Sequence, residues 1–259
     1  IKEYFKVLAS PEPSVANTAE SKIRYDLDMA FKPVTLIENQ TVCDDIVLLT
    51  FAEDFQIKPG EFVFLWVPGV GEKPFSVLCD KPLQLVAINV GEFTDSLMSL
   101  KPGQETYLRG PYGQAVEPLS RQKVIAVAGG TGLAAVLQIA EDFGSAEQPA
   151  DIFVGARTAN RLYFREECES AARVTIATDD GSAGFEGRVS DALAAFLAEQ
   201  SAAALEKMIF YNCGPAPMIH ASEAVQQQFV SADRIFSAID YLTKCGVGIC
   251  GACASPDGR

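Results

Sequence analysis

Short hydrophobic runs rich in β-branched and aromatic residues dominate the first half of the chain, from about residue 33 to residue 118. The clearest runs are Ile46–Phe51, Glu61–Val67 and Leu83–Val90. Turn signals separate these runs at Pro59-Gly60 and Pro68-Gly69, and a further one follows at Pro102-Gly103. Closely spaced strands without helix-length gaps predict a small antiparallel β barrel. We expect one short helix, over Thr94–Leu100, to interrupt it.

From about Gln122 onward, apolar strand-like runs alternate with segments of helical periodicity. The predicted strands are Val124–Ala128, Ala150–Val154, Val174–Thr178 and Met208–Asn212. The predicted helices are Thr131–Phe143, Leu162–Ser170, Val189–Lys207 with Ser190 as its cap, and Pro217–Val230. Alternating strands and helices indicate βαβ units and a parallel sheet. The predicted fold class is therefore a β barrel plus an α/β domain.

These patterns divide the chain into four predicted segments. Residues 1–31 form an extension to which we assign no role, with one strand expected over Ser21–Leu27. Residues 32–119 form the barrel domain, and residues 120–236 form the α/β domain. Residues 237–259 form a glycine- and cysteine-rich segment that matches neither helix nor strand.

Charge and hydropathy exclude several classes of partner. The formal net charge is −13 and the pI is about 4.6, which argues against binding to the phosphates of nucleic acid or to anionic lipid. The longest near-apolar run, Val124 to Ala140, contains three glycines and is shorter than the roughly 18 residues of a membrane span. With no signal peptide pattern, we expect a soluble cytoplasmic protein. The chain starts at Ile1 without a methionine, so we expect residues to precede it.

Three cysteines near the end have C-x4-C-x2-C spacing: Cys245, Cys250 and Cys253. This is the spacing of plant-type 2Fe–2S centres, and the intervening glycines let a loop bend around a cluster. A structural zinc site or three free thiols are the alternatives, although zinc ribbons favour paired C-x2-C units. No cysteine follows Cys253 in this chain. We expect the fourth ligand beyond Arg259, while Asp257 or the earlier cysteines are alternatives.

Glycine-rich turns follow three of the predicted strands. Gly129-Gly130-Thr131-Gly132 joins a strand to a helix, whose free N–H groups and positive dipole end suit a pyrophosphate. It is not the full G-x-G-x-x-G pattern, so a purely structural turn is the alternative. The other two turns are Thr178–Ser182 and Cys213–Met218. Ligands of open α/β sheets bind at the carboxyl ends of the strands, so the three turns indicate one shared cleft.

From about residue 32 to the end, the ordered motifs resemble the ferredoxin–NADP reductase superfamily. Within it, the chain is most similar to the electron-transfer subunits of heterotetrameric dihydroorotate dehydrogenases. Lys73-Pro74-Phe75-Ser76 resembles the Arg-x-x-Ser flavin motif, and residues 90–96 resemble the flavin-pyrophosphate loop. Gly110-Pro111-Tyr112-Gly113 resembles the motif that closes the barrel, and the cysteine loop resembles the 2Fe–2S site. We recognise no counterpart of segment 1–31 in the family.

The resemblance implies FAD on the barrel, NAD(H) in the cleft and a 2Fe–2S cluster at the cysteine loop. The residues implied to bind FAD or NAD(H) are Lys73, Pro74, Phe75, Ser76, Asn89, Val90, Gly91, Phe93, Thr94, Asp95, Ser96, Gly129, Gly130, Thr131, Gly132, Asp179, Cys213, Gly214, Pro215 and Met218. The implied cluster ligands are Cys245, Cys250 and Cys253. A hydride would pass between the nicotinamide and the flavin, with Ser76 near flavin N5 and Cys213 facing the nicotinamide.

Each of these roles has a structural alternative. Ser76 is also compatible with an ordinary strand residue, and Cys213 with a buried core thiol. Thr94 and Ser96 are also compatible with helix capping, and Asp179 and Asp180 with turn formation. We assign no role to His220, the only histidine, which we expect on a solvent-facing helix.

Two positions bear on the cofactors. Lys73 stands where the family has arginine, and lysine acts as a point charge rather than a two-pronged donor. The change weakens the expected FAD binding or allows FMN in its place. Arg157 follows the second predicted strand of the α/β domain and suits the extra phosphate of NADP(H), whereas the resemblance favours NAD(H).

The resemblance implies an oxidoreductase subunit of pyrimidine biosynthesis, with an FMN-containing dihydroorotate dehydrogenase catalytic subunit as its partner in a hetero-oligomer. The equivalent subunit of a bifurcating ferredoxin–NADP reductase, a hydrogenase or a sulfite reductase is an alternative. A redox-sensing binding protein without turnover is an alternative of another class.

Overall fold

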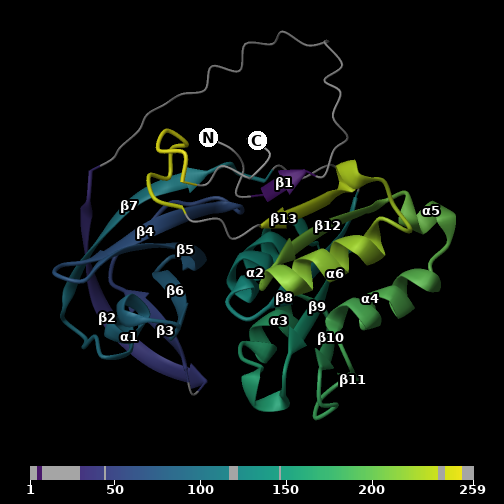
Figure 1. The fold of residues 1–259 in the computed structure, drawn as a ribbon, viewed down its shortest axis with the longest axis horizontal. Coiled ribbons are helices and arrows are strands. Elements are labelled where there is room, and N and C mark those ends of the chain that lie inside the picture. The colour runs from purple at the N-terminus through teal and green to yellow at the C-terminus, as the bar shows by residue number, and fades with distance from the viewer. Residues whose placement is uncertain are drawn as a thin grey trace, which may run out of the picture.

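The computed structural model describes residues 5–7, 30–43, 45–116, 122–145, 147–238 and 243–252. Figure 1 shows the barrel and the α/β domain side by side, with helix α2 (Gly132–Phe143) between the barrel and the parallel sheet. The predicted strand over Ser21–Leu27 lies outside the described residues.

The barrel is closed by antiparallel pairings in the order β2-β3-β6-β5-β4-β7. Its strands are β2 (Lys32–Cys43), β3 (Ile46–Phe51), β4 (Glu61–Val67), β5 (Gly71–Asp80), β6 (Leu83–Ile88) and β7 (Glu105–Gly113). The expected helix is α1 (Glu92–Met98). The Nδ2 of Asn39 holds the end of this helix by donating to the carbonyls of Leu97 and Leu100, each at 2.9 Å. The barrel prediction is confirmed.

The α/β domain contains a seven-stranded sheet in the order β1-β13-β12-β8-β9-β10-β11. The strands are β1 (Phe5–Val7), β8 (Lys123–Gly129), β9 (Ala150–Ala156), β10 (Ala172–Thr178), β11 (Phe185–Glu186), β12 (Met208–Cys213) and β13 (Ile235–Ala238). All pairings are parallel except that of β1 with β13. The parallel sheet is therefore confirmed.

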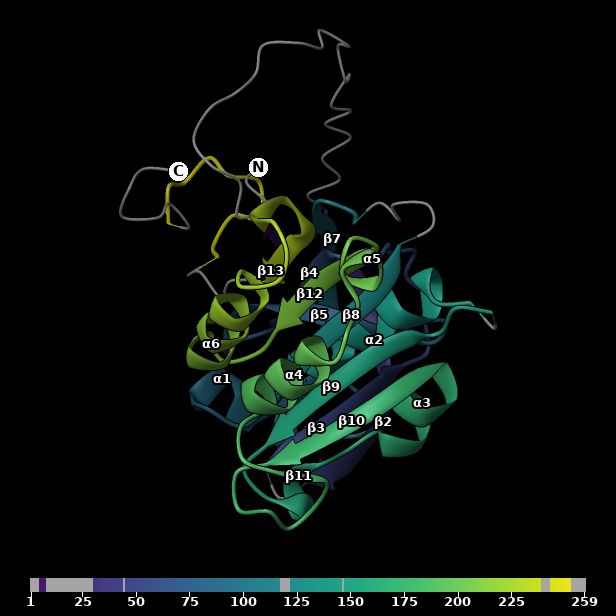
Figure 2. The same ribbon diagram turned by 90° about the vertical axis from the view of Figure 1, so that its right-hand side faces the viewer.

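Helices cover both faces of this sheet, as Figure 2 shows. They are α3 (Arg165–Ala171), α4 (Val189–Ala198), α5 (Ala202–Leu205) and α6 (Ala216–Gln226), with short 3-10 turns at Ala159–Arg161 and Ala232–Arg234. Helices α2 and α3 lie on one face, and α4 and α6 pack together on the other. His220 lies on α6 with 68% of its side chain exposed, as expected.

The prediction of one helix over Val189–Lys207 with Ser190 as its cap was wrong. Helix α4 ends at Ala198, and Ser201 caps the separate helix α5 by accepting a hydrogen bond from the N–H of Ala204 at 3.3 Å. Serine competes well for cap positions, so it ends a helix-forming run more readily than alanine does. Ser190 instead lies inside the first turn of α4 and is 5% exposed.

Helix α3 also begins later than predicted, at Arg165 rather than Leu162. The residue before it, Phe164, has a left-handed backbone with φ of 53°. Such a backbone is incompatible with the right-handed helix turn that the hydrophobic periodicity indicated.

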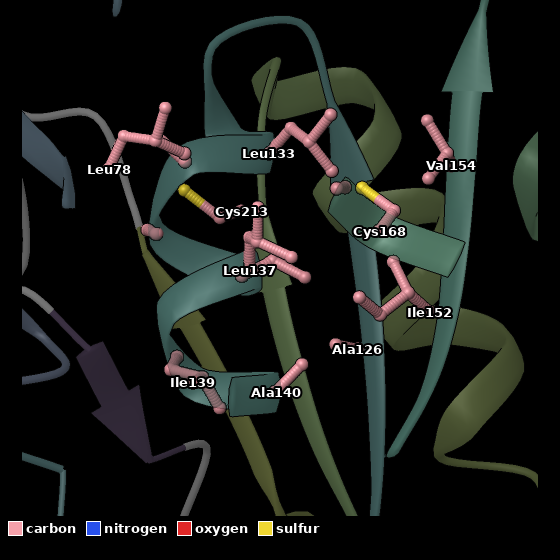
Figure 3. Close-up of a cluster of buried hydrophobic side chains, with 14 of the residues drawn as sticks. Leu78, Ala126, Leu133, Leu137, Ile139, Ala140, Ile152, Val154, Cys168 and Cys213 are labelled. Atoms are coloured by element: carbon pink, nitrogen blue, oxygen red, sulfur yellow. The ribbon is translucent and has the colours of Figure 1, made fainter. Parts of the chain in front are cut away.

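A continuous apolar core joins the barrel to the α/β domain. Leu48, Leu78 and Val86 of the barrel belong to the same buried cluster as Leu133 and Leu137 of α2. Figure 3 shows Leu78 with Leu133 and Leu137 in this cluster. Burial of apolar surface stabilises the folded state by about 25 cal/mol per Å². This cluster therefore holds the barrel and the α/β domain in a defined relative position.

Within the described residues, every helix is too short or too polar to cross a membrane.

Candidate cofactor cleft and cysteine loop

A cleft of about 880 Å³ lies between the barrel and the carboxyl ends of the central sheet strands. Its walls come from β5, from the loop and first turn of α1, and from the turns after β8 and β12. The predicted site residues that line it are Lys73, Pro74, Phe75, Ser76, Val90, Gly91, Phe93, Thr94, Gly129, Gly130, Thr131, Gly132, Cys213, Gly214 and Pro215. The fold thus brings together residues that are up to about half the chain apart.

Three predicted residues around α1 lie outside this lining. The Nδ2 of Asn89 donates to Asp95 Oδ1 at 3.1 Å, and the Oγ of Ser96 donates to the carbonyl of Phe93 at 2.6 Å. These side chains hold the helix and its preceding loop together. Their contact with a cofactor stays a prediction.

The hydroxyl of Thr94 caps α1 while the residue lines the cleft. Its Oγ1 accepts from the N–H groups of Val90 at 2.9 Å and Gly91 at 3.1 Å, and donates to the carbonyl of Gly91 at 3.0 Å. The capping alternative therefore holds for Thr94, together with its place in the cleft wall.

The turn after β8 and the end of β12 approach so closely that only glycine fits between them. A Cβ on Gly132 would lie 2.2 Å from the carbonyl oxygen of Cys213. The glycine therefore lets the first turn of α2 pack against β12, which places both turns on one wall of the cleft.

Sequence reasoning missed Tyr163, which contacts the turn after β8. Its hydroxyl donates to the carbonyl of Gly130, and burial raises the pKa of this phenol well above its ordinary value. The phenol therefore stays protonated and available as a donor. A lone tyrosine after an apolar strand carries no motif that would have indicated this contact.

Cys213 lies both in the apolar core and in the wall of the cleft. It is the last residue of β12, is 6% exposed and belongs to the apolar cluster beneath α2, where Figure 3 shows it beside Leu137. It also lines the cleft. Ser76, half-buried on β5, lines the same cleft. Their catalytic roles stay predictions.

A second cleft of about 610 Å³ lies at the carboxyl ends of β8, β9 and β10. It shares Gly129, Gly130 and Pro215 with the first cleft. It is lined by Asp179 and Met218, which were predicted, and by Arg157, Arg161 and Arg188. Arg161 forms an ion pair with Asp45 across the two domains.

Asp180, next to this second cleft, behaves as a turn former. Its carboxylate accepts hydrogen bonds from the N–H of Ser182 at 3.0 Å and from the hydroxyl of Ser182 at 2.5 Å. The hydrogen bonds from Ser182 lower the pKa of Asp180.

The cysteine loop, residues 243–252, lies against the outside of the barrel above β4 and β7 (Figure 1). Val247 is 5% exposed and packs with Phe62, Phe64 and Tyr112. Cys245 is half-buried at this contact, whereas Cys250 is exposed.

The loop surrounds the sulfur of Cys245 with hydrogen-bond donors. Partial burial raises the pKa of this thiol, but backbone N–H groups of Cys250, Val247 and Ile249 lower it more, to about 6. The side chain of Cys250 also contacts it. Donors that favour the thiolate suit a metal ligand. Cys253 and Asp257 lie outside the described residues, and among those described no group of three or more candidate ligands converges.

Comparison with known proteins shows which family this chain belongs to. Residues 126–224 match the model of the oxidoreductase NAD-binding domain. A Methanocaldococcus jannaschii protein named "Probable dihydroorotate dehydrogenase B (NAD(+)), electron transfer subunit" is 35% identical over 87% of this chain and 85% of its own. A Pyrococcus horikoshii protein of the same name is 37% identical over 85% of this chain and 83% of its own. The chain belongs to this family.

Membership of the dihydroorotate dehydrogenase B electron transfer subunit family confirms the resemblance found in the sequence and the prediction of an oxidoreductase subunit. A solved structure has a similar architecture, with a TM-score of 0.76 and 25% identity over 85% of this chain and 80% of that one. That structure is of an NADH-dependent reduced ferredoxin–NADP oxidoreductase and was described for flavin-based electron bifurcation.

Proposed function

We propose that the chain passes electrons between NAD(H), FAD and a 2Fe–2S cluster, and from there to or from a dihydroorotate dehydrogenase catalytic subunit in pyrimidine biosynthesis. Family membership supports the proposal, since the relatives are named electron transfer subunits of an NAD(+)-dependent enzyme. The chemistry of the two clefts and of the cysteine loop agrees with it.

The first cleft fits a flavin. It has apolar walls from Phe75 and Phe93, whose ring centroids lie 6.3 Å apart, and the Lys73 ammonium for a phosphate. When bound, FAD would exchange a hydride with the nicotinamide and single electrons with the cluster. Ser76 would orient the ring by donating a hydrogen bond, and no general acid is needed for hydride transfer.

The second cleft fits the adenosine end of a dinucleotide. The Gly129–Gly132 turn presents N–H groups at the start of α2, where a pyrophosphate is favoured. Arg157 suits an additional phosphate, whereas the carboxylate of Asp179 beside it repels one. We propose NAD(H) as the physiological nucleotide.

Cys245 and Cys250 fit two ligands of the cluster, with Cys253 as the proposed third. Thr243 lines the first cleft, and Cys245 follows it by two residues. Two residues span at most about 7 Å of extended chain. This proximity between the cleft wall and the cysteine loop is the observation that carries the proposal, because single electrons must tunnel between the two groups.

The test uses the whole chain, purified without oxygen. It should be yellow-brown and contain flavin, iron and acid-labile sulfide, and NADH should bleach its flavin absorbance. A colourless protein that carries zinc instead of iron would contradict the proposal.

The solved structure named for flavin-based bifurcation supports a second candidate, the equivalent subunit of a bifurcating ferredoxin–NADP reductase. An anaerobic pull-down separates the two, because the proposed subunit brings down a protein that oxidises dihydroorotate. A redox sensor without turnover would oxidise NADH only slowly with an artificial acceptor.

A further inference from the structure

A nearly buried arginine connects the cysteine loop to the strand that carries the flavin motif. Arg109 lies on β7, and 5% of its side chain is exposed. Its Nε and one terminal nitrogen donate to the two carboxylate oxygens of Glu72, both at 2.8 Å. On the other side it donates to the carbonyls of Cys245 at 2.9 Å and Lys244 at 3.0 Å. Glu72 immediately precedes Lys73 on β5.

The arginine and the loop rest on the same aromatic side chains. The guanidinium carbon lies 3.9 Å from the ring centroid of Phe64 and 5.2 Å from that of Tyr112. Gly246 has φ of 80°, and a Cβ there would lie 2.9 Å from the Tyr112 ring. The loop therefore has little freedom to shift along the barrel wall.

These contacts need an arginine. Its planar group has five N–H donors in a fixed fork, which allows two bonds to a carboxylate and further bonds to backbone carbonyls at once. Lysine keeps the charge but lacks the fork. The guanidinium is nearly buried, so removing it takes these donors away from the Glu72 carboxylate and from the two loop carbonyls at once.

Resting on the function proposed above, we propose that Arg109 is a positioning residue for the iron–sulfur loop. Its bonds to the carbonyls of Lys244 and Cys245 hold the loop at a fixed place on the barrel. Its charge offsets that of the Glu72 carboxylate, which it contacts, and net charge near a cluster is one determinant of the reduction potential. Arg109 thus acts through Cys245 and the loop backbone without ligating iron.

Four variants separate the effect of Arg109 on the position of the loop from its effect on the charge near the loop. They are Arg109→Gln, Arg109→Lys, Glu72→Gln and the double variant Arg109→Gln/Glu72→Gln. Arg173→Gln is the matched control, because it removes an arginine that is 69% exposed and pairs with Asp151 at 3.3 Å, away from the loop.

The first measurement is amide hydrogen exchange of residues 244–250 in the protein freed of iron. Exchange is expected to rise by about tenfold or more in Arg109→Gln and in the double variant, because charge-assisted bonds to the loop are lost. Arg109→Lys should show a smaller rise, and Arg173→Gln none. Unchanged exchange in Arg109→Gln overturns the positioning role.

The second measurement is the reduction potential and the electron paramagnetic resonance spectrum of the iron-loaded protein. Arg109→Gln should lower the potential, since it leaves the Glu72 carboxylate uncompensated, and Glu72→Gln should raise it. The double variant should return the potential toward that of the unmodified protein while its loop exchange stays high. Equal potentials in all variants overturn the electrostatic part.

A wild-type protein without iron would refute the proposed function alone, because the exchange measurement still decides the role of Arg109. If Arg109→Gln does not fold, Arg109→Lys decides it, and wild-type exchange in that variant counts against the inference.

Discussion

The first cleft and the cysteine loop are assembled differently. The cleft takes its walls from β5, α1 and two turns of the α/β domain, which lie far apart in the sequence. The loop is one short stretch whose own N–H groups surround the sulfur of Cys245. A substitution that adds bulk where the two domains meet in the cleft therefore disturbs packing between them, whereas one in the loop acts locally unless it removes a contact with Arg109.

The largest effect is expected for Gly132→Ala, which tests whether the cleft depends on close packing of two turns. Overpacked sites typically cost about 1–3 kcal/mol, and a new Cβ here would meet a backbone carbonyl at 2.2 Å, which cannot move aside easily. We expect a cost at or above that range, measured by urea unfolding, together with loss of NADH binding.

Gly91→Ala is the control for this prediction. No atom lies within 4 Å of a Cβ at that position, and its φ of 165° is open to any residue. Its unfolding midpoint should match that of the unmodified protein. Equal midpoints for Gly132→Ala and Gly91→Ala would show that the turn contact is unimportant.

Next in size is the loss of iron in Cys245→Ser. The loop should lose its cluster while the flavin content of the cleft is retained, as iron, sulfide and flavin analyses would show. Cys79→Ser, on β5 away from the loop, is the control and should keep its iron. Loss of flavin together with iron would mean that loop and cleft do not fold independently.

Ser76→Ala should have a smaller effect. Loss of one hydrogen bond of about 1–1.5 kcal/mol corresponds to flavin reduction roughly tenfold slower. Stopped-flow reduction by NADH measures it, with flavin content nearly unchanged. Ser99→Ala, at the exposed end of α1, serves as the control. An unchanged rate would favour the ordinary strand residue.

The smallest effect concerns the contact between the two domains. Partial desolvation, and then the charge of Asp80 on the barrel, raise the pKa of Asp142 at the end of α2. A raised pKa in the folded state means that ionisation of Asp142 destabilises the fold as pH rises through this range.

Asp142→Asn should therefore raise the urea midpoint slightly at about pH 7 and leave it unchanged near pH 3, where the carboxyl is protonated in both states. The gain stays small because the side chain is exposed. Glu38→Gln, which removes an exposed carboxylate on β2, is the matched control. A gain for Asp142→Asn that is equal at both pH values would exclude the electrostatic cause.

Local patterns were enough for much of the fold. Short runs such as Ile46–Phe51 and the apolar run at Val124 predicted barrel strands and the first sheet strand, because their side chains are buried on the expected faces. Strand β5 was not predicted, since Lys73 to Ser76 line the cleft and their side chains need not alternate between apolar and polar. Strand β13 has four residues, too few for a periodic signal.

The candidate site also has features that local patterns predicted and features that they did not. The sequence by itself determined the family through its ordered motifs, and it gave the local patterns behind two predictions: a glycine turn that suits a phosphate and a cysteine spacing typical of an iron–sulfur cluster. Turn conformation and thiol spacing depend on neighbours along the chain, so they can be recognised without coordinates.

Only the tertiary structure decided which side chains support these motifs. Tyr163 under the Gly130 turn and Arg109 between Glu72 and Cys245 occupy positions with no motif of their own. Their contacts join residues 33 to 136 positions apart. The physical reason is that such contacts arise from the packing of the barrel on α2 and of the loop on β7, and packing is a property of surfaces that meet only after folding.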